Sequence, residues 1–132
     1  SQTAGAEPQV LIRPVRDIGD DSFQVFSAQD VKRAEEIEPL EEVIDELKRE
    51  LNRRHIRRLR EGECTIELGF SLADITTSLE RVADHCSNIA VCISQVKEDM
   101  YDTHEYLDTM KYEDDGFFRG QVSEIQEKYI LP

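Results

Sequence analysis

The sequence contains no tryptophan, and aromatic residues make up only 7% of its 132 residues. A sheet sandwich would draw on more aromatic and β-branched side chains. A content of 34% charged residues instead suits the solvated faces of long helices. A chain of this length has the usual size of one domain and can hardly bury two independent cores. We therefore expect a single all-α domain.

Cysteine is also scarce. Cys64, Cys86 and Cys92 form no Cys-x-x-Cys pair and are odd in number, which argues against a disulfide framework and a cysteine-type zinc site. A reducing cytoplasm suits such thiols. No apolar run reaches the about 20 residues that span a bilayer, and the N-terminal residues lack the basic and apolar regions of a secretion signal. Because the chain starts with Ser1 rather than Met, we expect a piece of a longer protein.

The six glycines are scattered, so the sequence has no glycine-rich phosphate loop, and it also lacks a nucleophile elbow and a kinase-type lysine motif. These absences give catalysis no support, and we expect no enzyme. The formal net charge of -13 repels phosphate groups and anionic lipid, which argues against nucleic acid as a partner.

Basic residues gather in one short stretch despite the acidic balance. They are Lys48, Arg49, Arg53, Arg54, Arg57, Arg58 and Arg60. One interpretation is that cations collect near a helix C-terminus, where the helix dipole favours them. The other is a docking surface for a protein or for an acidic lipid headgroup.

The chain is expected to divide into two regions. Residues 1–8 are expected to be a disordered leader or a cloning remnant, and residues 9–132 a helical bundle. The first apolar positions at helical spacing predict a helix that starts between Pro8 and Pro14, because proline is tolerated in a first turn and disruptive further in.

Two long helices follow, over about 30–61 and 64–99. Asp30 is the expected N-cap of the first, Pro39 should kink or break it, and Gly62 should end it. Their apolar residues recur in alternating steps of three and four, which is typical of helices that bury one face. We expect these residues to be buried together: Ile44, Leu47, Leu51, Leu72, Leu79, Val82 and Ile89.

A last helix is predicted over 117–129, with a short one over 103–110. Long helices with such stripes, joined by short turns, bury their apolar faces against one another. The predicted fold is therefore an antiparallel bundle of three to four helices.

Two carboxylate pairs stand out on the long helices. Glu41 precedes Asp45, and Glu80 precedes Asp84, by four residues each, so each pair shares one helical face and repels itself. A nearby cation would relieve both pairs, whether a metal ion or an Arg or Lys side chain. Hard cations such as calcium, magnesium and manganese, and also iron, accept oxygen ligands of this kind. The geometry permits a metal site.

His85 and Asn88 extend the second pair and could add a nitrogen or amide ligand. The alternative is that each histidine is an ordinary hydrogen-bonded or surface residue. With 29 acidic residues in the chain, spacings of four also arise by chance, and the Glu-x-x-His pattern of di-iron bundles is missing.

The segment Leu79–Val91, with the sequence LERVADHCSNIAV, resembles the signature helix of PhoU proteins. The matching positions are Glu80, Arg81, Asp84, His85, Asn88 and Ile89. The earlier segment EEVIDEL, with Glu41 four residues before Asp45, resembles the companion motif on the preceding helix. The resemblance implies a three-helix regulatory unit connected with phosphate uptake or its signalling. It also raises the expectation of iron, zinc or another divalent metal at Glu41, Asp45, Glu80 and Asp84.

The longer stretch over roughly 30–110 is similar to the PhoU-like region that follows the membrane part of bacterial sodium/phosphate cotransporter family proteins. This resemblance implies a cytoplasmic domain at the inner face of the cell membrane. The implied partner is the membrane transporter portion of the same or a partner chain, and a homo-oligomer is compatible with it. Two alternatives stay open: a free-standing metal-binding PhoU-like protein, and a helical adaptor without metal.

Overall fold

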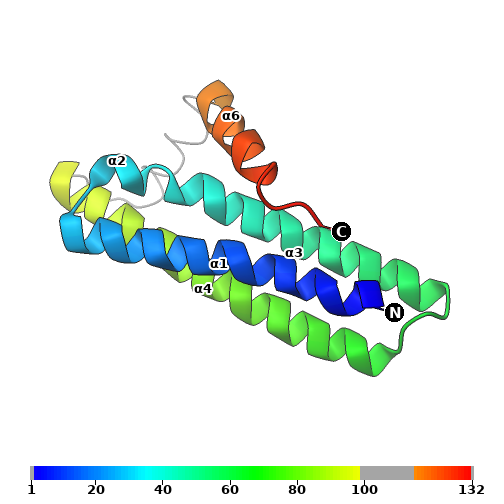
Figure 1. Ribbon diagram of the computed structural model, residues 1–132. Helices are drawn as coiled ribbons and strands as arrows, with labels where there is room; N and C mark the ends of the chain where they lie inside the picture. The colour runs from blue at the N-terminus through cyan, green and yellow to red at the C-terminus, as the bar shows by residue number, and fades with distance from the viewer. Residues whose placement is uncertain (1, 99–114, 132) are drawn as a thin grey trace.

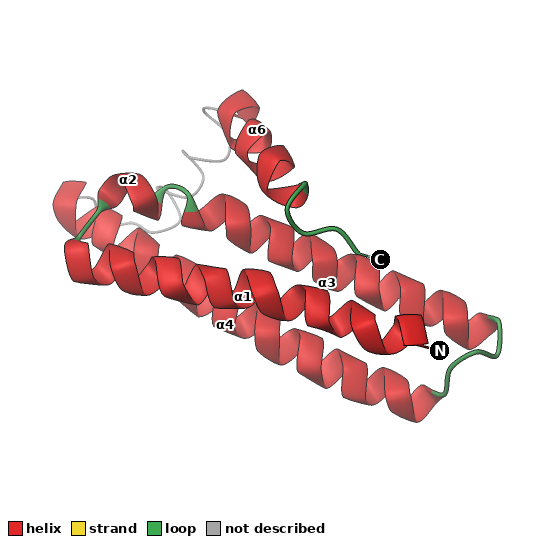
Figure 2. Cartoon of the chain, in the orientation of Figure 1, coloured by secondary structure: helices red, strands yellow, loops and turns green. Residues whose placement is uncertain are grey.

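The computed structural model describes residues 2–98 and 115–131. Three long helices lie side by side, with two short helices at one end and one side (Figures 1 and 2). The long helices are α1 (Gln2–Ala28), α3 (Ile37–Arg60) and α4 (Ile66–Glu98), and the short ones are α2 (Val31–Ala34) and α6 (Asp115–Gln126). Figure 1 shows α1 and α4 running in one direction and α3 in the other. The described residues contain no strand, and the predicted all-α antiparallel bundle is confirmed.

The N-terminal segment differs from the expectation. Helix α1 begins at Gln2 and contains both Pro8 and Pro14, so the expected disordered leader is part of the bundle. An interior proline costs a helix about 3 kcal/mol. Here Pro14 is fully buried in the core, and the side chain of Glu7 is buried as well. We attribute the extended helix to these buried contacts, which offset the cost of the prolines.

The predicted break near Pro39 is confirmed. Asp30 caps α2 by accepting a hydrogen bond from the Arg33 backbone N–H at 3.3 Å. The chain then leaves helical order for two residues, and α3 starts at Ile37 with Pro39 in its first turn, where no helical N–H is needed. Gly62 ends α3 with a φ of 72°, a left-handed conformation that glycine adopts without strain.

The core is formed by the apolar faces of α1, α3 and α4. Ile44, Leu47 and Leu51 are buried as predicted. The prediction that Val82 and Ile89 are buried is wrong, because 47% and 43% of their surface is exposed. The side of α4 that enters the core instead carries small residues. These are Thr76, Ala83, Ser87, Ala90 and Ser94.

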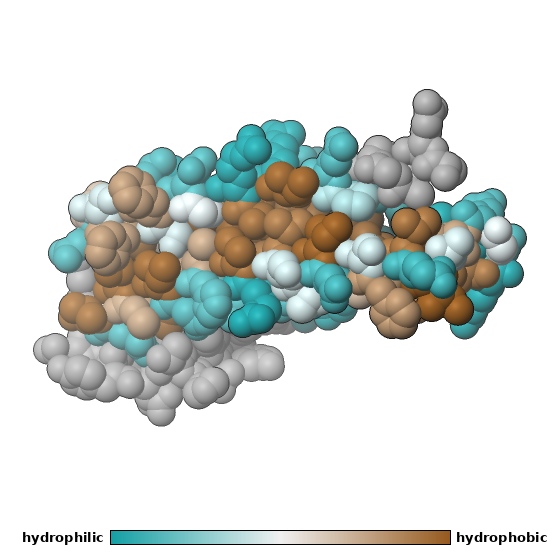
Figure 3. Space-filling view, turned by 90° about the horizontal axis from the view of Figure 1, so that it is seen from below, coloured by the Kyte–Doolittle hydropathy of each residue, from teal (hydrophilic) through white to brown (hydrophobic). Residues whose placement is uncertain are grey.

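The apolar stripe of α4 consists of two rows of residues. The row of Leu72, Leu79, Cys86 and Ile93 is half-buried. The second row, which we call the α4 apolar row, is exposed and consists of Leu68, Ile75, Val82, Ile89 and Val96. Figure 3 views the molecule from the side on which α4 lies in Figure 1. Apolar surface is gathered along the middle of this face of the molecule.

Helix α6 confirms the predicted last helix and packs on α3. Phe118 and Val122 are buried, and the Tyr129 hydroxyl donates a hydrogen bond of 2.5 Å to Asp17 of α1. The helix predicted over 103–110 lies outside the described residues. Within the described ranges, no helix has the length and apolar character needed to cross a bilayer.

Candidate functional site between α3 and α4

Polar side chains line the seam between the antiparallel helices α3 and α4. The Lys48 ammonium donates a hydrogen bond to the Glu80 carboxylate at 2.9 Å, with both side chains about a quarter exposed or less. Closer to the start of α3, the Ser87 hydroxyl donates to the buried carboxylate of Glu38. The two contacts connect the helices at two levels along one polar seam.

Of the four predicted carboxylates, the structure places Glu80 in a contact between α3 and α4. Glu41 and Asp45 precede Lys48 by seven and three residues, so they share its face of α3. On α4, Asp84 follows Glu80 by one helical turn and is exposed. The contact between Lys48 and Glu80 thus joins the helices that carry the two motifs, while the convergence of the four carboxylates stays a prediction.

The seam carboxylates have basic partners. Glu80 binds Lys48, and Asp45 accepts from Arg49 at 2.9 Å. The sequence allowed either a metal ion or a basic side chain to relieve each carboxylate pair, and the structure shows basic side chains at Asp45 and Glu80. Among the described residues, no three His, Cys, Asp or Glu side chains are grouped in a way that could hold a metal ion. The observed arrangement is thus not an assembled metal site, and metal binding stays a prediction.

The two weaker candidates, His85 and Asn88, are exposed on α4. Both lie within four residues of Asp84 or Glu80 along the chain, but a metal ion at the seam would need them to share a centre with the carboxylates. No such group is found in the part of the chain that the structure describes.

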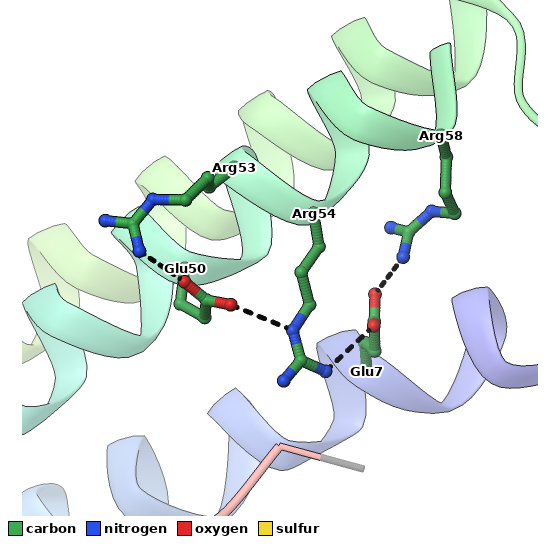
Figure 4. A network of polar contacts seen from close by, with 5 residues as sticks. All are labelled: Glu7, Glu50, Arg53, Arg54 and Arg58. Carbon is green, nitrogen blue, oxygen red and sulfur yellow. Dashed lines mark hydrogen bonds and ion pairs between the residues drawn. The ribbon is translucent and has the colours of Figure 1, made fainter. Parts of the chain in front are cut away.

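The basic stretch of α3 contributes to a network that joins α3 to α1 (Figure 4). Glu7, whose side chain is only 3% exposed, accepts from Arg58 at 2.7 Å and from Arg54 at 3.2 Å. Arg54 also binds Glu50 at 3.0 Å, and Arg53 binds the other oxygen of Glu50 at 2.7 Å. The hydrogen bond with Glu50 raises the pKa of Arg54 above its ordinary value. Arg53, Arg54 and Arg58 of the basic stretch therefore form ion pairs within the molecule.

A histidine and a cysteine meet at the turn between α3 and α4. His55 is buried, and its Nδ1 lies 3.4 Å from the Cys64 Sγ. Its Nε2 lies against Gly69, where an added Cβ would come within 2.5 Å. The isolated Gly69, which costs the helix about 1 kcal/mol against alanine, is thus explained by a close approach. In the sequence, the unfavourable Gly69 within a long helix was the only sign of the contact with His55.

Two hollows lie away from the seam, on the side of α3 that packs on α6. One of about 240 Å³ is lined largely by polar side chains, including Asp21, Glu36 and Lys128. The other, of about 370 Å³, is lined by α3 residues such as Val43 and by the C-terminal residues. Neither includes a predicted site residue.

The three long helices match a known family. The model of the PhoU domain matches residues 11–93, which is well over half of the chain and covers most of α1, all of α3 and most of α4. This chain belongs to the PhoU domain family. Both acidic motifs lie inside the matched range, so the PhoU part of the resemblance is confirmed.

One curated relative of this PhoU domain is the phosphate-specific transport system accessory protein PhoU homolog 1 of Thermotoga maritima. It is 36% identical over 69 residues, which cover 52% of this chain and 30% of the relative. The chain thus matches less than a third of the relative's length. No solved structure matches the chain.

Proposed function

We propose that this PhoU domain is a regulatory unit for phosphate uptake that works at the cytoplasmic side of a phosphate transporter. The family match over the three long helices carries the proposal. It is supported by the relative, whose name describes an accessory protein of a phosphate-specific transport system. Binding rather than catalysis suits the seam, whose charged groups already pair with one another.

We further propose a transporter of the sodium/phosphate cotransporter family as the partner, in the same or a separate chain. This finer assignment is supported by the resemblance of the stretch over roughly 30–110. A free-standing accessory PhoU protein fits the family match and the relative equally well. The encoding reading frame separates the two, because apolar segments of about 20 residues before this domain would place it in a membrane protein.

The seam between α3 and α4 is the proposed regulatory site. The pair of Arg49 and Asp45 is partly solvated and contributes only about 0 to 1 kcal/mol. The pair of Lys48 and Glu80 is more enclosed, with side chains 20% and 24% exposed. A basic side chain of a partner protein could replace Lys48 at Glu80. Such an exchange would couple binding of the transporter to the packing of the two helices.

Phosphate uptake by cells tests the proposal. Deleting residues 11–93 should change the rate of radioactive phosphate uptake under phosphate-replete conditions, and Glu80→Gln with Asp84→Asn should reproduce much of that change. A matched control replaces two exposed acids outside the seam, Asp20→Asn with Glu127→Gln, and should behave like wild type. Uptake that is the same in all four strains would refute a role in phosphate uptake.

A further inference from the structure

A buried imidazole faces a cysteine thiol at the turn between α3 and α4. This turn lies at the end of the bundle where α1 begins (Figure 1). The Sγ atom of the partly exposed Cys64 lies 3.4 Å from Nδ1 of His55, a residue that is only 7% exposed. The sulfur therefore meets solvent on one hand and a fixed hydrogen-bonding group on the other. A nucleophile within hydrogen-bond reach of an imidazole is the arrangement by which proteins activate thiols.

The surroundings of His55 decide which ring nitrogen carries the proton. Nε2 is buried and has no hydrogen-bond partner among the described residues. An added Cβ at Gly69 would lie 2.5 Å from Nε2, so a Cα hydrogen of this glycine points at the nitrogen. A proton on Nε2 would thus be a buried donor without an acceptor, which is costly, whereas a lone pair tolerates the Cα hydrogen. We therefore assign the proton of the neutral ring to Nδ1, the nitrogen that faces Cys64.

The thiol proton of Cys64 has a separate acceptor. The S–H group donates to the backbone carbonyl of Thr65 at 3.8 Å, so the sulfur can accept from Nδ1–H at the same time. When the thiol releases its proton to solvent, Nδ1–H of His55 stays in place and stabilises the negative sulfur. The thiolate is the nucleophilic form of cysteine. The geometry thus provides a partly exposed sulfur with a donor already aimed at it.

Two other uses of this pair do not fit the chain. A structural zinc ion takes four ligands, and in the described ranges no three His, Cys, Asp or Glu side chains are grouped to hold a metal ion. A disulfide joins Cα atoms about 4 to 7 Å apart. Cys86 lies 20 residues beyond Ile66, the first residue of α4, which is about 30 Å at 1.5 Å per residue, and Cys92 lies farther still. Cys64 therefore needs a reaction partner from outside the chain.

We propose that Cys64 is a site of reversible oxidation by hydrogen peroxide, with His55 as the residue that positions and stabilises its thiolate. The thiolate attacks one peroxide oxygen, so that an S–O bond forms and the O–O bond breaks. The hydroxide that leaves takes up the proton that the thiol released, which gives water and a sulfenic acid. The sulfur loses two electrons, and the peroxide gains them.

The sulfenic acid of Cys64 then reacts with a low-molecular-weight thiol. An S–S bond forms, the S–O bond breaks, and the departing hydroxyl leaves as water with the proton of the incoming thiol. The product is a mixed disulfide, which a further thiol can reduce back to the free cysteine. This step makes the oxidation reversible and keeps the sulfur from the higher, irreversible oxidation states.

Peptide mass spectrometry of the reduced 132-residue chain tests the proposal without a substitution. The chain is treated with less than one equivalent of hydrogen peroxide in the presence of dimedone, which traps sulfenic acids. Cys92 is more exposed than Cys64, so accessibility alone predicts that Cys92 is labelled first. We expect Cys64 to be labelled first, and Cys86 last, since burial raises the pKa of its thiol. Labelling of Cys92 as fast as that of Cys64 would overturn the proposal.

Two substitutions of similar size test the role of His55. His55→Asn keeps an N–H donor at the δ position, whereas His55→Leu removes it. A tenfold gain in thiolate lowers its nucleophilicity by about threefold, since the Brønsted coefficient is about 0.4 to 0.5, and this leaves a net gain of about threefold in rate. His55→Leu should therefore slow labelling of Cys64 by about threefold, and His55→Asn should keep most of the rate.

The rate at Cys92 is the internal control for both variants and should not change, with helical content checked by circular dichroism. Equal slowing at Cys64 by the two substitutions, or none by His55→Leu, would refute the role of His55. In a last measurement on wild type, peroxide with glutathione should give a mixed disulfide at Cys64 that dithiothreitol removes. A sulfinic acid at Cys64 in place of that adduct would refute reversible oxidation.

Discussion

The carboxylate of Glu7 lies 2.7 Å from the guanidinium of Arg58, although 51 positions separate the two residues in the sequence. The side chains are 3% and 11% exposed, so this ion pair is largely removed from water. It fixes the beginning of α1 against the end of α3, next to the second ion pair that Glu7 makes with Arg54. Removing one member of such a pair leaves a buried charge without compensation.

We expect Glu7→Ala to lower the free energy of unfolding by about 3 to 5 kcal/mol, measured by urea denaturation. Arg53→Ala removes a mostly exposed arginine of the same network and should cost about 1 kcal/mol or less. The double variant Glu7→Leu, Arg58→Met replaces the pair by apolar side chains and should recover most of the loss. Equal costs for Glu7→Ala and Arg53→Ala would contradict this role of Glu7.

A matched pair of truncations tests the observed core. Ile44→Ala should cost about 2 to 5 kcal/mol because Ile44 is completely buried and the cavity cannot close fully. Val82→Ala should cost less than about 1 kcal/mol, since nearly half of Val82 faces solvent. If the two substitutions shift the denaturation midpoint equally, the assignment of Val82 to the surface is wrong.

The helices could be predicted from the sequence because their signals are local. Asp30 supplies a cap within its own turn, and Gly62 supplies the left-handed residue that ends α3. The orientation of α4 could not be predicted in this way. Its stripe offers two apolar rows, and only the packing of α1 and α3 around Ala83 and Ala90 decides that the row with Val82 faces outward.

The pairing of the candidate residues could not be predicted from the sequence, and their role as a site stays a prediction. The spacing of Glu41 from Asp45 and of Glu80 from Asp84 could be read within each helix. The partner of Glu80, by contrast, comes from 32 residues away in the chain. No spacing rule within one motif reveals Lys48 as that partner, because the contact depends on the register of α3 against α4.

Tyr129 makes the stability of the folded chain depend on pH in the alkaline range. Burial raises the pKa of its phenol, and the hydrogen bond to Asp17 acts in the same direction. The folded state thus keeps the proton after the unfolded state, with a tyrosine pKa of about 10, begins to lose it. Stability that Tyr129 contributes is therefore complete below about pH 10 and falls as the pH rises further. Denaturation midpoints between pH 8 and 11.5 should fall more steeply for wild type than for Tyr129→Phe, and parallel curves would refute this.

A divalent metal ion could reach the Glu80 carboxylate only in competition with Lys48, which already binds it at 2.9 Å. Lys48→Met removes the competitor and leaves the carboxylates of the seam in place. We therefore expect manganese, iron(II) or zinc to raise the melting temperature of Lys48→Met more than that of wild type. A ligand that binds only the folded state adds about 2.7 kcal/mol at a hundredfold excess over its dissociation constant, so the shift should be measurable.

The charge of the carboxylates provides the control for this metal experiment. In Lys48→Met combined with Glu80→Gln and Asp84→Asn, the amides keep the shape of the side chains but lose the charge that a hard cation needs, and the rise should disappear. Arg53→Met removes a cation outside the seam and should respond like wild type. If Lys48→Met responds no more than Arg53→Met, whether metal or chelator is added, then the prediction of a metal site from the two acidic motifs fails. The seam is in that case held by its Lys and Arg partners alone.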